Sequence, residues 1–149
     1  MKLRLWLLII LPLLMGGGDS YPDTPEQVVA HYLRAIKNYD FPEAHLYLTD
    51  EMTRGADAFN WSVEQKQIYK YAEVKVNGYK VYEAMIEGDK ASVPNILSSR
   101  DKFLNKSGAD EYEIYILIKI NGYWTIDRQR LVNEKDKNKW FNNLVISSN

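Results

Sequence analysis

The spacing of apolar residues divides the chain into a helical part and a strand-like part. Between residues 24 and 38, apolar side chains recur every three or four positions, which is the spacing of one buried helix face. The same spacing returns over residues 40–48 and 62–72. From residue 73 onward the spacing falls to two, as in half-buried β-strands. The pattern therefore predicts an α+β domain, in which N-terminal helices precede a sheet.

Each predicted helix begins with residues that favour a helix start. Thr24 stands at the N-cap of the first helix, Pro25 occupies its first turn, and Gln27 can close a capping box. Asp40 and Ser62 take the N-cap position of the second and third helices. We therefore expect the first helix to run from about residue 24 to residue 38.

Two turn dipeptides divide the strand-like part into hairpins. The Gly88-Asp89 pair separates the runs 73–87 and 90–104, and a glycine in the first turn position suits a type II′ turn. The Asn121-Gly122 pair is the strongest hairpin signal in the chain. Because hairpins join antiparallel strands, the sheet is predicted to be antiparallel.

The two-residue turn at Asn121-Gly122 fixes the register between residues 110–120 and 123–130. One face of this hairpin, which we call the isoleucine face, then carries Ile114, Ile116, Ile118 and Ile120, with Tyr112, Tyr123, Thr125 and Asp127. The opposite face carries Tyr115, Leu117, Trp124 and Ile126. Since both faces hold large apolar groups, we expect both to be covered.

The last segment, residues 133–146, is predicted to form a C-terminal helix that docks on the sheet. Asn133 is its candidate cap. The apolar side of this helix would consist of Trp140, Phe141, Leu144 and Val145.

Residues 1–18 have the pattern of a signal peptide or N-terminal anchor. They begin with a positive end containing Lys2 and Arg4, continue with a short apolar run, and end with three glycines. An ordinary transmembrane helix needs about 20 apolar residues, and this run is shorter. We therefore expect residues 19–149 to be a single exported domain that is periplasmic, envelope-associated or secreted.

Composition excludes several kinds of site. The chain has 149 residues and no cysteine, which rules out thiol catalysis, disulfides and cysteine-bound metal. Its 19 basic and 20 acidic residues are interspersed, which argues against nucleic-acid binding. The only histidines, His31 and His45, lie on different helices without a metal-ligand spacing. No cofactor, metal or nucleic acid is predicted.

The order of elements, with three short motifs, resembles the nuclear transport factor 2-like superfamily. The motifs are Pro25-Glu26-Gln27-Val28-Val29 with Tyr32-Leu33, then Asn38-Tyr39-Asp40-Phe41 with Ala44, and the closing Gly122-Tyr123-Trp124-Thr125-Ile126. The resemblance covers roughly residues 24–130, and exported, lipoprotein-like bacterial members of unknown function are the most similar. It implies a cystatin-like cone, in which a curved antiparallel sheet wraps around helices. Members of the superfamily include isomerases, dehydratases, small-ligand binders and secretion-apparatus subunits.

The isoleucine face is the candidate wall of a ligand site inside that cone. Asp127 is the carboxylate that the register places there, where burial would raise its pKa. Tyr32, Tyr112 and Tyr123 are candidate hydroxyl partners, an arrangement similar to the acid and tyrosine of ketosteroid isomerase. The alternative is that Asp127 lies at the mouth of the cone, hydrated or paired with an arginine. Trp61 either closes one end of the cavity or fills the core.

The opposite face has two readings of equal weight. Its cluster is either a partner or homodimer surface or the seat of the C-terminal helix. The residues of this candidate interface are Tyr115, Leu117, Trp124 and Ile126.

Three functions are compatible with these patterns. The first is an exported, non-enzymatic domain whose cone binds a small apolar ligand or whose sheet face binds protein. The second is an isomerase-like or dehydratase-like enzyme that uses Asp127 with tyrosine hydroxyls. The third is an envelope or secretion-assembly subunit that keeps its N-terminal anchor.

Overall fold

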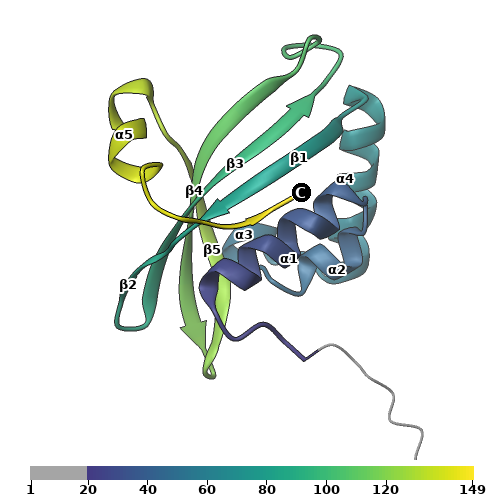
Figure 1. The fold of residues 1–149 in the computed structure, drawn as a ribbon. Coiled ribbons are helices and arrows are strands. Elements are labelled where there is room, and N and C mark those ends of the chain that lie inside the picture. Colours follow the sequence, from purple (N-terminus) through teal and green to yellow (C-terminus); the bar gives the residue numbers. More distant parts are fainter. Residues whose placement is uncertain (1–19) are drawn as a thin grey trace, which may run out of the picture.

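Helices fill the first part of the described chain and strands the second (Figure 1). The computed structural model describes residues 20–149, so the predicted signal segment lies outside the described residues. The helices before the sheet are α1 (Pro25–Lys37), α2 (Phe41–His45), α3 (Asp50–Thr53) and α4 (Ala58–Ala72). The strands that follow are β1 (Lys75–Tyr82), β2 (Met85–Glu87), β3 (Lys90–Arg100), β4 (Ala109–Ile120) and β5 (Tyr123–Leu131). The α+β prediction is confirmed.

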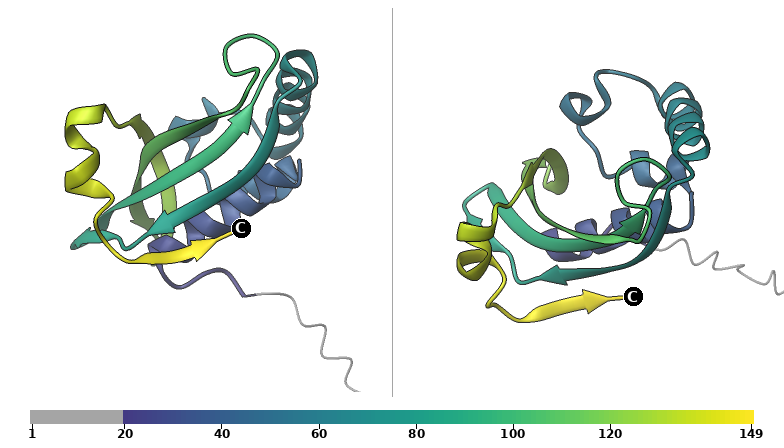
Figure 2. Two further views of the ribbon diagram at one scale, coloured as in Figure 1. Left: turned by 45° about the horizontal axis from the view of Figure 1, so that its top comes forward. Right: turned by 90° about the horizontal axis from the view of Figure 1, so that it is seen from above.

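The strands form one antiparallel sheet in the order β5-β4-β3-β1-β6, and β2 pairs with β3 beside this path. The last strand, β6 (Val145–Ser148), comes from the C-terminal end of the chain. The sheet curves around α1, which lies across its concave side (Figure 2). Within residues 20–149, no helix is both long and apolar enough to span a membrane.

Helix α1 begins at its predicted N-cap, Thr24. The third predicted helix corresponds to α4, which begins earlier than predicted. The Thr24 hydroxyl accepts from the Gln27 backbone N–H at 3.2 Å, and the Gln27 side chain accepts from the Thr24 backbone N–H, which completes the capping box. Asp57, and not Ser62, caps α4 by accepting from the Asn60 backbone N–H at 2.9 Å. Ser62 lies inside the helix, where its hydroxyl donates to the backbone carbonyl of an earlier turn.

The hairpin at Asn121-Gly122 has the backbone that a type I′ turn requires, with φ angles of 51° and 84°. The predicted register holds for residues 117–120. A β-bulge then shifts it by one, so that Ile116 pairs with Arg128 instead of Asp127. Asp127 is therefore the additional residue of the bulge, and the predicted pairing is wrong beyond it.

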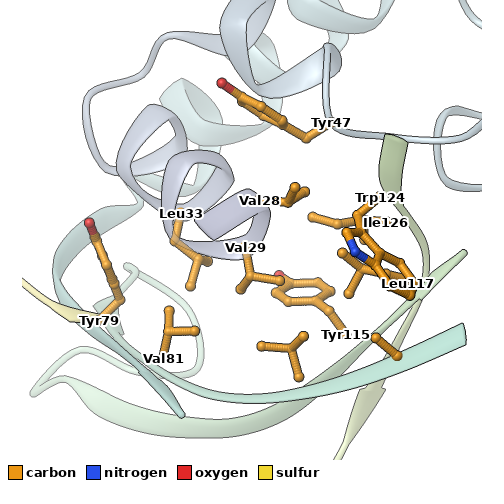
Figure 3. Packing of buried hydrophobic residues seen from close by; sticks show 12 residues of the cluster. Val28, Val29, Leu33, Tyr47, Tyr79, Val81, Tyr115, Leu117, Trp124 and Ile126 are labelled. Atoms are coloured by element: carbon orange, nitrogen blue, oxygen red, sulfur yellow. The ribbon is translucent and has the colours of Figure 1, made fainter. Parts of the chain in front are cut away.

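The helices cover the face opposite to the one predicted (Figure 3). Side chains of α1, including Val28, Val29 and Leu33, pack on the face proposed as an interface, so that the chain itself buries it. No member of that cluster is more than 5% exposed: Tyr115, Leu117, Trp124 and Ile126. Both faces carry large apolar side chains, and alternation alone does not indicate which of them a helix covers.

The C-terminal segment is not one long helix. It forms a 3-10 turn at Glu134–Asp136, the single-turn helix α5 (Lys137–Trp140) and β6. Asn133 caps the first turn as predicted, by accepting from the Asp136 backbone N–H at 3.1 Å. Phe141 packs on the isoleucine side of the sheet, where its ring lies 4.9 Å from that of Tyr112. Leu144 and Val145 are 68% and 41% exposed, so the predicted apolar side does not form.

Gly78 allows β6 to approach β1 closely. A Cβ atom at this position would lie 2.5 Å from the backbone oxygen of Asn149, which is closer than van der Waals contact permits. We expect Gly78→Ala to push the end of β6 away and to break the reciprocal bonds between Tyr79 and Asn149. Amide hydrogen exchange should show faster exchange at these two residues, whereas Lys80→Ala should leave their exchange unchanged. Equal protection in both variants would contradict the close contact.

Candidate functional site

Three polar side chains form a cluster on the helix-facing side of adjacent strands. Asn95 in β3 and Glu113 in β4 are register partners. Gln129 in β5 donates from Nε2 to Glu113 Oε1 over 2.6 Å. Asn95 is 0% exposed and Glu113 is 1% exposed, whereas Gln129 is exposed. The cluster thus extends from the interior to the surface at β5, and we call these three residues the polar cluster.

The interior part of the polar cluster has unused hydrogen-bonding capacity. Among residues 20–149, neither Asn95 Nδ2, nor Asn95 Oδ1, nor Glu113 Oε2 has a hydrogen-bond partner. Leaving a buried polar group unpaired costs about 1–3 kcal/mol, and native proteins contain few such groups. The protein therefore leaves one donor atom and two acceptor atoms of the polar cluster unused.

Three tyrosines from different elements lie near Glu113 of the polar cluster. The rings of Tyr32 in α1 and Tyr115 in β4 lie 5.6 Å apart in an edge-to-face arrangement. Burial, followed by the nearby charge of Glu113, raises the pKa of Tyr69 in α4 to about 12. Burial also raises the pKa of Tyr32 and that of Tyr115. All three hydroxyls therefore stay protonated at neutral pH, where they are hydrogen-bond donors.

Burial raises the pKa of the Glu113 carboxyl to about 7. The charge of Glu111 also raises this pKa, whereas the Gln129 amide lowers it by donating a hydrogen bond to the carboxylate. Near pH 7 the carboxyl is thus present in both protonation states. A group with this pKa serves either as a proton acceptor or as a proton donor at physiological pH.

Comparison with solved structures gives the fold a name. A ketosteroid isomerase-like protein from Erwinia carotovora atroseptica matches with a TM-score of 0.54 and 20% identity, over 72% of this chain and 93% of that chain. The arrangement is a curved antiparallel sheet around helices. The fold is nuclear transport factor 2-like. At this level of identity the likeness establishes the fold alone.

Two further solved structures are similar to this chain. RPA3114, a SEC-C motif containing protein from Rhodopseudomonas palustris, matches with a TM-score of 0.59 and 15% identity, over 76% of this chain and 83% of that chain. Bd1075 from Bdellovibrio bacteriovorus matches with a TM-score of 0.52 and 14% identity over 71% of this chain, which spans 39% of the length of Bd1075. No family model and no curated protein sequence matches the chain.

Asp127, the predicted acid, does not lie on the helix-facing side of the sheet in the nuclear transport factor 2-like fold. It lies beside Ile116 and Ile118 of the isoleucine face. Its side chain is 16% exposed, accepts from the Thr49 hydroxyl at 3.1 Å and lies 3.3 Å from Arg128 Nε. Asp127 and Tyr123 both line a surface depression of about 610 Å³. The carboxylate is thus partnered within the protein by Thr49 and Arg128.

The remaining predicted site residues do not gather around Asp127. Tyr32 lies on the helix-facing side of the cone with Tyr115, whereas Tyr112 lies against Phe141 on the opposite side. Trp61 is 5% exposed, and its ring lies 6.3 Å from that of Phe41 within the core. Of the predicted ligand-binding set, only Tyr32 lies beside the polar cluster.

Sequence reasoning missed Asn95, Glu113, Gln129 and Tyr69. A signal for two of them exists: Glu113 occupies the same alternation as Tyr115 and Leu117, and Asn95 the same alternation as Val93 and Leu97. A polar residue at an apolar position of a strand pattern is the signature of a buried functional group. It was overlooked because the opposite face was taken as the interior.

Proposed function

We propose that this chain is an exported ligand-binding domain whose nuclear transport factor 2-like cone binds a small organic molecule at the polar cluster. The observation that supports this best is the pair of buried side chains, Asn95 and Glu113, with three unpartnered polar atoms on adjacent strands. Binding a ligand would satisfy these atoms and recover part of the free energy that their burial costs. Export is supported by the signal-like pattern of residues 1–18.

The surroundings of the polar cluster favour a ligand with an apolar body and one hydroxyl or carbonyl group. The Asn95 amide can donate to a carbonyl and accept from a hydroxyl. The rings of Tyr32, Tyr69 and Tyr115 would contact the apolar body. Leu131, which pairs with Glu113 across β4 and β5, is 68% exposed, so the sheet edge beside Gln129 is the expected entrance.

A second function, acid–base catalysis, is favoured by the pKa of Glu113. A carboxylate with a pKa of about 7 can remove a proton from the carbon next to a ketone carbonyl. The proton would pass to Glu113, and a tyrosine hydroxyl would donate a hydrogen bond to the resulting enolate oxygen. The proton would then return from Glu113 to another carbon of the same ligand. This is isomerisation without a cofactor, with Glu113 in the role that the sequence assigned to Asp127.

Ligand-observed NMR with a set of cyclic ketones, phenols and alcohols tests the binding proposal. We expect Asn95→Leu to weaken each binding molecule about tenfold, because one buried hydrogen bond is lost. The same substitution should raise the free energy of unfolding by about 1 kcal/mol or more, since it removes an unpartnered buried amide. Thr125→Val, which changes a polar side chain on the opposite face, is the control and should leave binding unchanged.

Loss of stability in Asn95→Leu together with unchanged ligand affinity would contradict the proposal.

Catalysis is distinguished from binding by deuterium exchange. If Glu113 acts as a base, a bound ketone in D₂O will exchange the hydrogens next to its carbonyl, and Glu113→Gln will abolish the exchange while retaining binding. A ketone that binds without exchange assigns the domain to binding alone.

A further inference from the structure

A second candidate site is a groove between α2 and α4. It has a volume of about 840 Å³, within the range of small-molecule sites. Its walls are mainly apolar and include Phe41, Pro42, Phe59, Val63 and Val74. Neither Asn95 nor Glu113 lines it, whereas Tyr69, which lies near the polar cluster, also lines the groove. The groove and the polar cluster are therefore neighbouring sites with one tyrosine in common.

The apolar walls of the groove are unusually accessible to solvent. Phe59 is 76% exposed and Val63 is 40% exposed, although they lie one turn apart on the same side of α4. Tyr39, at the start of the opposite wall, is 46% exposed. Contiguous exposed apolar side chains of this kind mark a binding surface more often than isolated ones do.

Two lysines give the groove a charge. Lys66 and Lys70 line it one helical turn apart, further along α4 than Phe59 and Val63. Within residues 20–149, neither lysine forms an ion pair. Glu73 also lines the groove, and its Oε1 forms an ion pair with Lys102 Nζ at 3.4 Å. One end of the groove is therefore apolar, and the other carries two lysines that form no ion pair in the described part of the chain, beside one paired carboxylate.

We propose that this groove binds a single-chain anionic amphiphile, specifically a long-chain carboxylate. Its head group would lie between Lys66 and Lys70, and its alkyl chain would run along Val63 and Phe59. The distance along α4 from the level midway between the two lysines to residue 59 is about 14 Å at 1.5 Å per residue, similar to an extended chain of dodecanoate. Such a ligand would contact both the apolar walls and the two lysines, whereas a neutral lipid would contact the apolar walls without pairing with the lysines.

Calorimetric titration of the purified chain with dodecanoate, below its micelle concentration, tests the proposal. We expect one dodecanoate per chain, and binding at least tenfold weaker for neutral dodecanol. Decanoate should bind about tenfold more weakly than dodecanoate, because two methylene groups leave the apolar wall. Lys66→Gln with Lys70→Gln should weaken dodecanoate binding at least tenfold and leave dodecanol binding unchanged. Val63→Asp should abolish the binding of both.

Matched controls separate this site from general charge and from the polar cluster. Lys106→Gln with Lys135→Gln removes the same charge from exposed positions outside the groove and should leave dodecanoate binding unchanged. Glu113→Gln should also leave it unchanged. Unchanged dodecanoate binding in Val63→Asp, equal loss in the control pair, or binding only to phosphatidylglycerol vesicles would overturn the proposal. All these positions except Glu113 are at least partly exposed, so the variants are expected to fold.

Discussion

Glu113→Gln should make the protein more stable at pH 8, by about 3 kcal/mol, and should flatten its stability between pH 5 and pH 8. Glu113 is 1% exposed, and burial raises its pKa from the ordinary value of 4.5 to about 7. Each pKa unit corresponds to about 1.4 kcal/mol, so the difference between the folded and unfolded states amounts to about 3 kcal/mol. Glutamine keeps the shape of the side chain and has no charge to bury.

The direction of the pH dependence follows from the raised pKa of Glu113. Between pH 4.5 and about 7, the folded protein holds a proton on Glu113 that the unfolded chain has released. Unfolding therefore releases a proton, and the free energy of unfolding falls as the pH rises through this window. Above about pH 7 both states are ionised, and this contribution no longer changes.

Urea denaturation of both proteins at pH 5, 6, 7 and 8 measures the effect. Glu87→Gln is the matched control, since Glu87 is an exposed carboxylate in the β2–β3 hairpin. We expect this control to retain the decline seen in the unaltered protein. A parallel decline in Glu113→Gln would show that Glu113 is ionised in the folded state at low pH, and would remove the main support for acid–base chemistry.

Leu117→Ala should lower the free energy of unfolding by about 3 kcal/mol. Leu117 is 0% exposed under α1, and truncating a buried leucine removes apolar contacts and leaves a cavity. Leu104→Ala provides the same chemical change at a side chain that is 90% exposed, where we expect a change within about 0.5 kcal/mol. Denaturant titration and analytical ultracentrifugation together test the role of this face. A partner surface would change association with little change in stability, which is the opposite of the expected result.

Local signals in the sequence predicted the early elements well. Thr24 with Gln27 specified where α1 begins, because the capping box is a short-range arrangement. The Asn121-Gly122 pair specified a turn and the pairing beside it for the same reason. The same kind of local signal was wrong at Ser62, because α4 already begins at Ala58 with Asp57 as its N-cap.

The errors concern features that depend on distant parts of the chain. The bulge at Asp127 changes the register by one, and a regular alternation contains no signal for it. Once the covered face was assigned wrongly, Asp127 replaced Glu113 as the candidate acid. The apolar residues from Trp140 to Val145 have helical spacing. The residues from Val145 onward nevertheless pair with β1, because an unpaired strand edge offers backbone hydrogen bonds.

That final pairing has a consequence for how the protein avoids associating with itself. The side of β1 turned away from β3 would otherwise present a row of free amide and carbonyl groups, which readily recruits a strand from another molecule. β6 occupies this row, and the bond from Lys37 to the Asn149 side chain, 2.9 Å long, fastens it to α1. A chain without its last residues would keep its buried core but expose an unpaired strand edge. β6 is therefore expected to prevent association between molecules more than it stabilises the core.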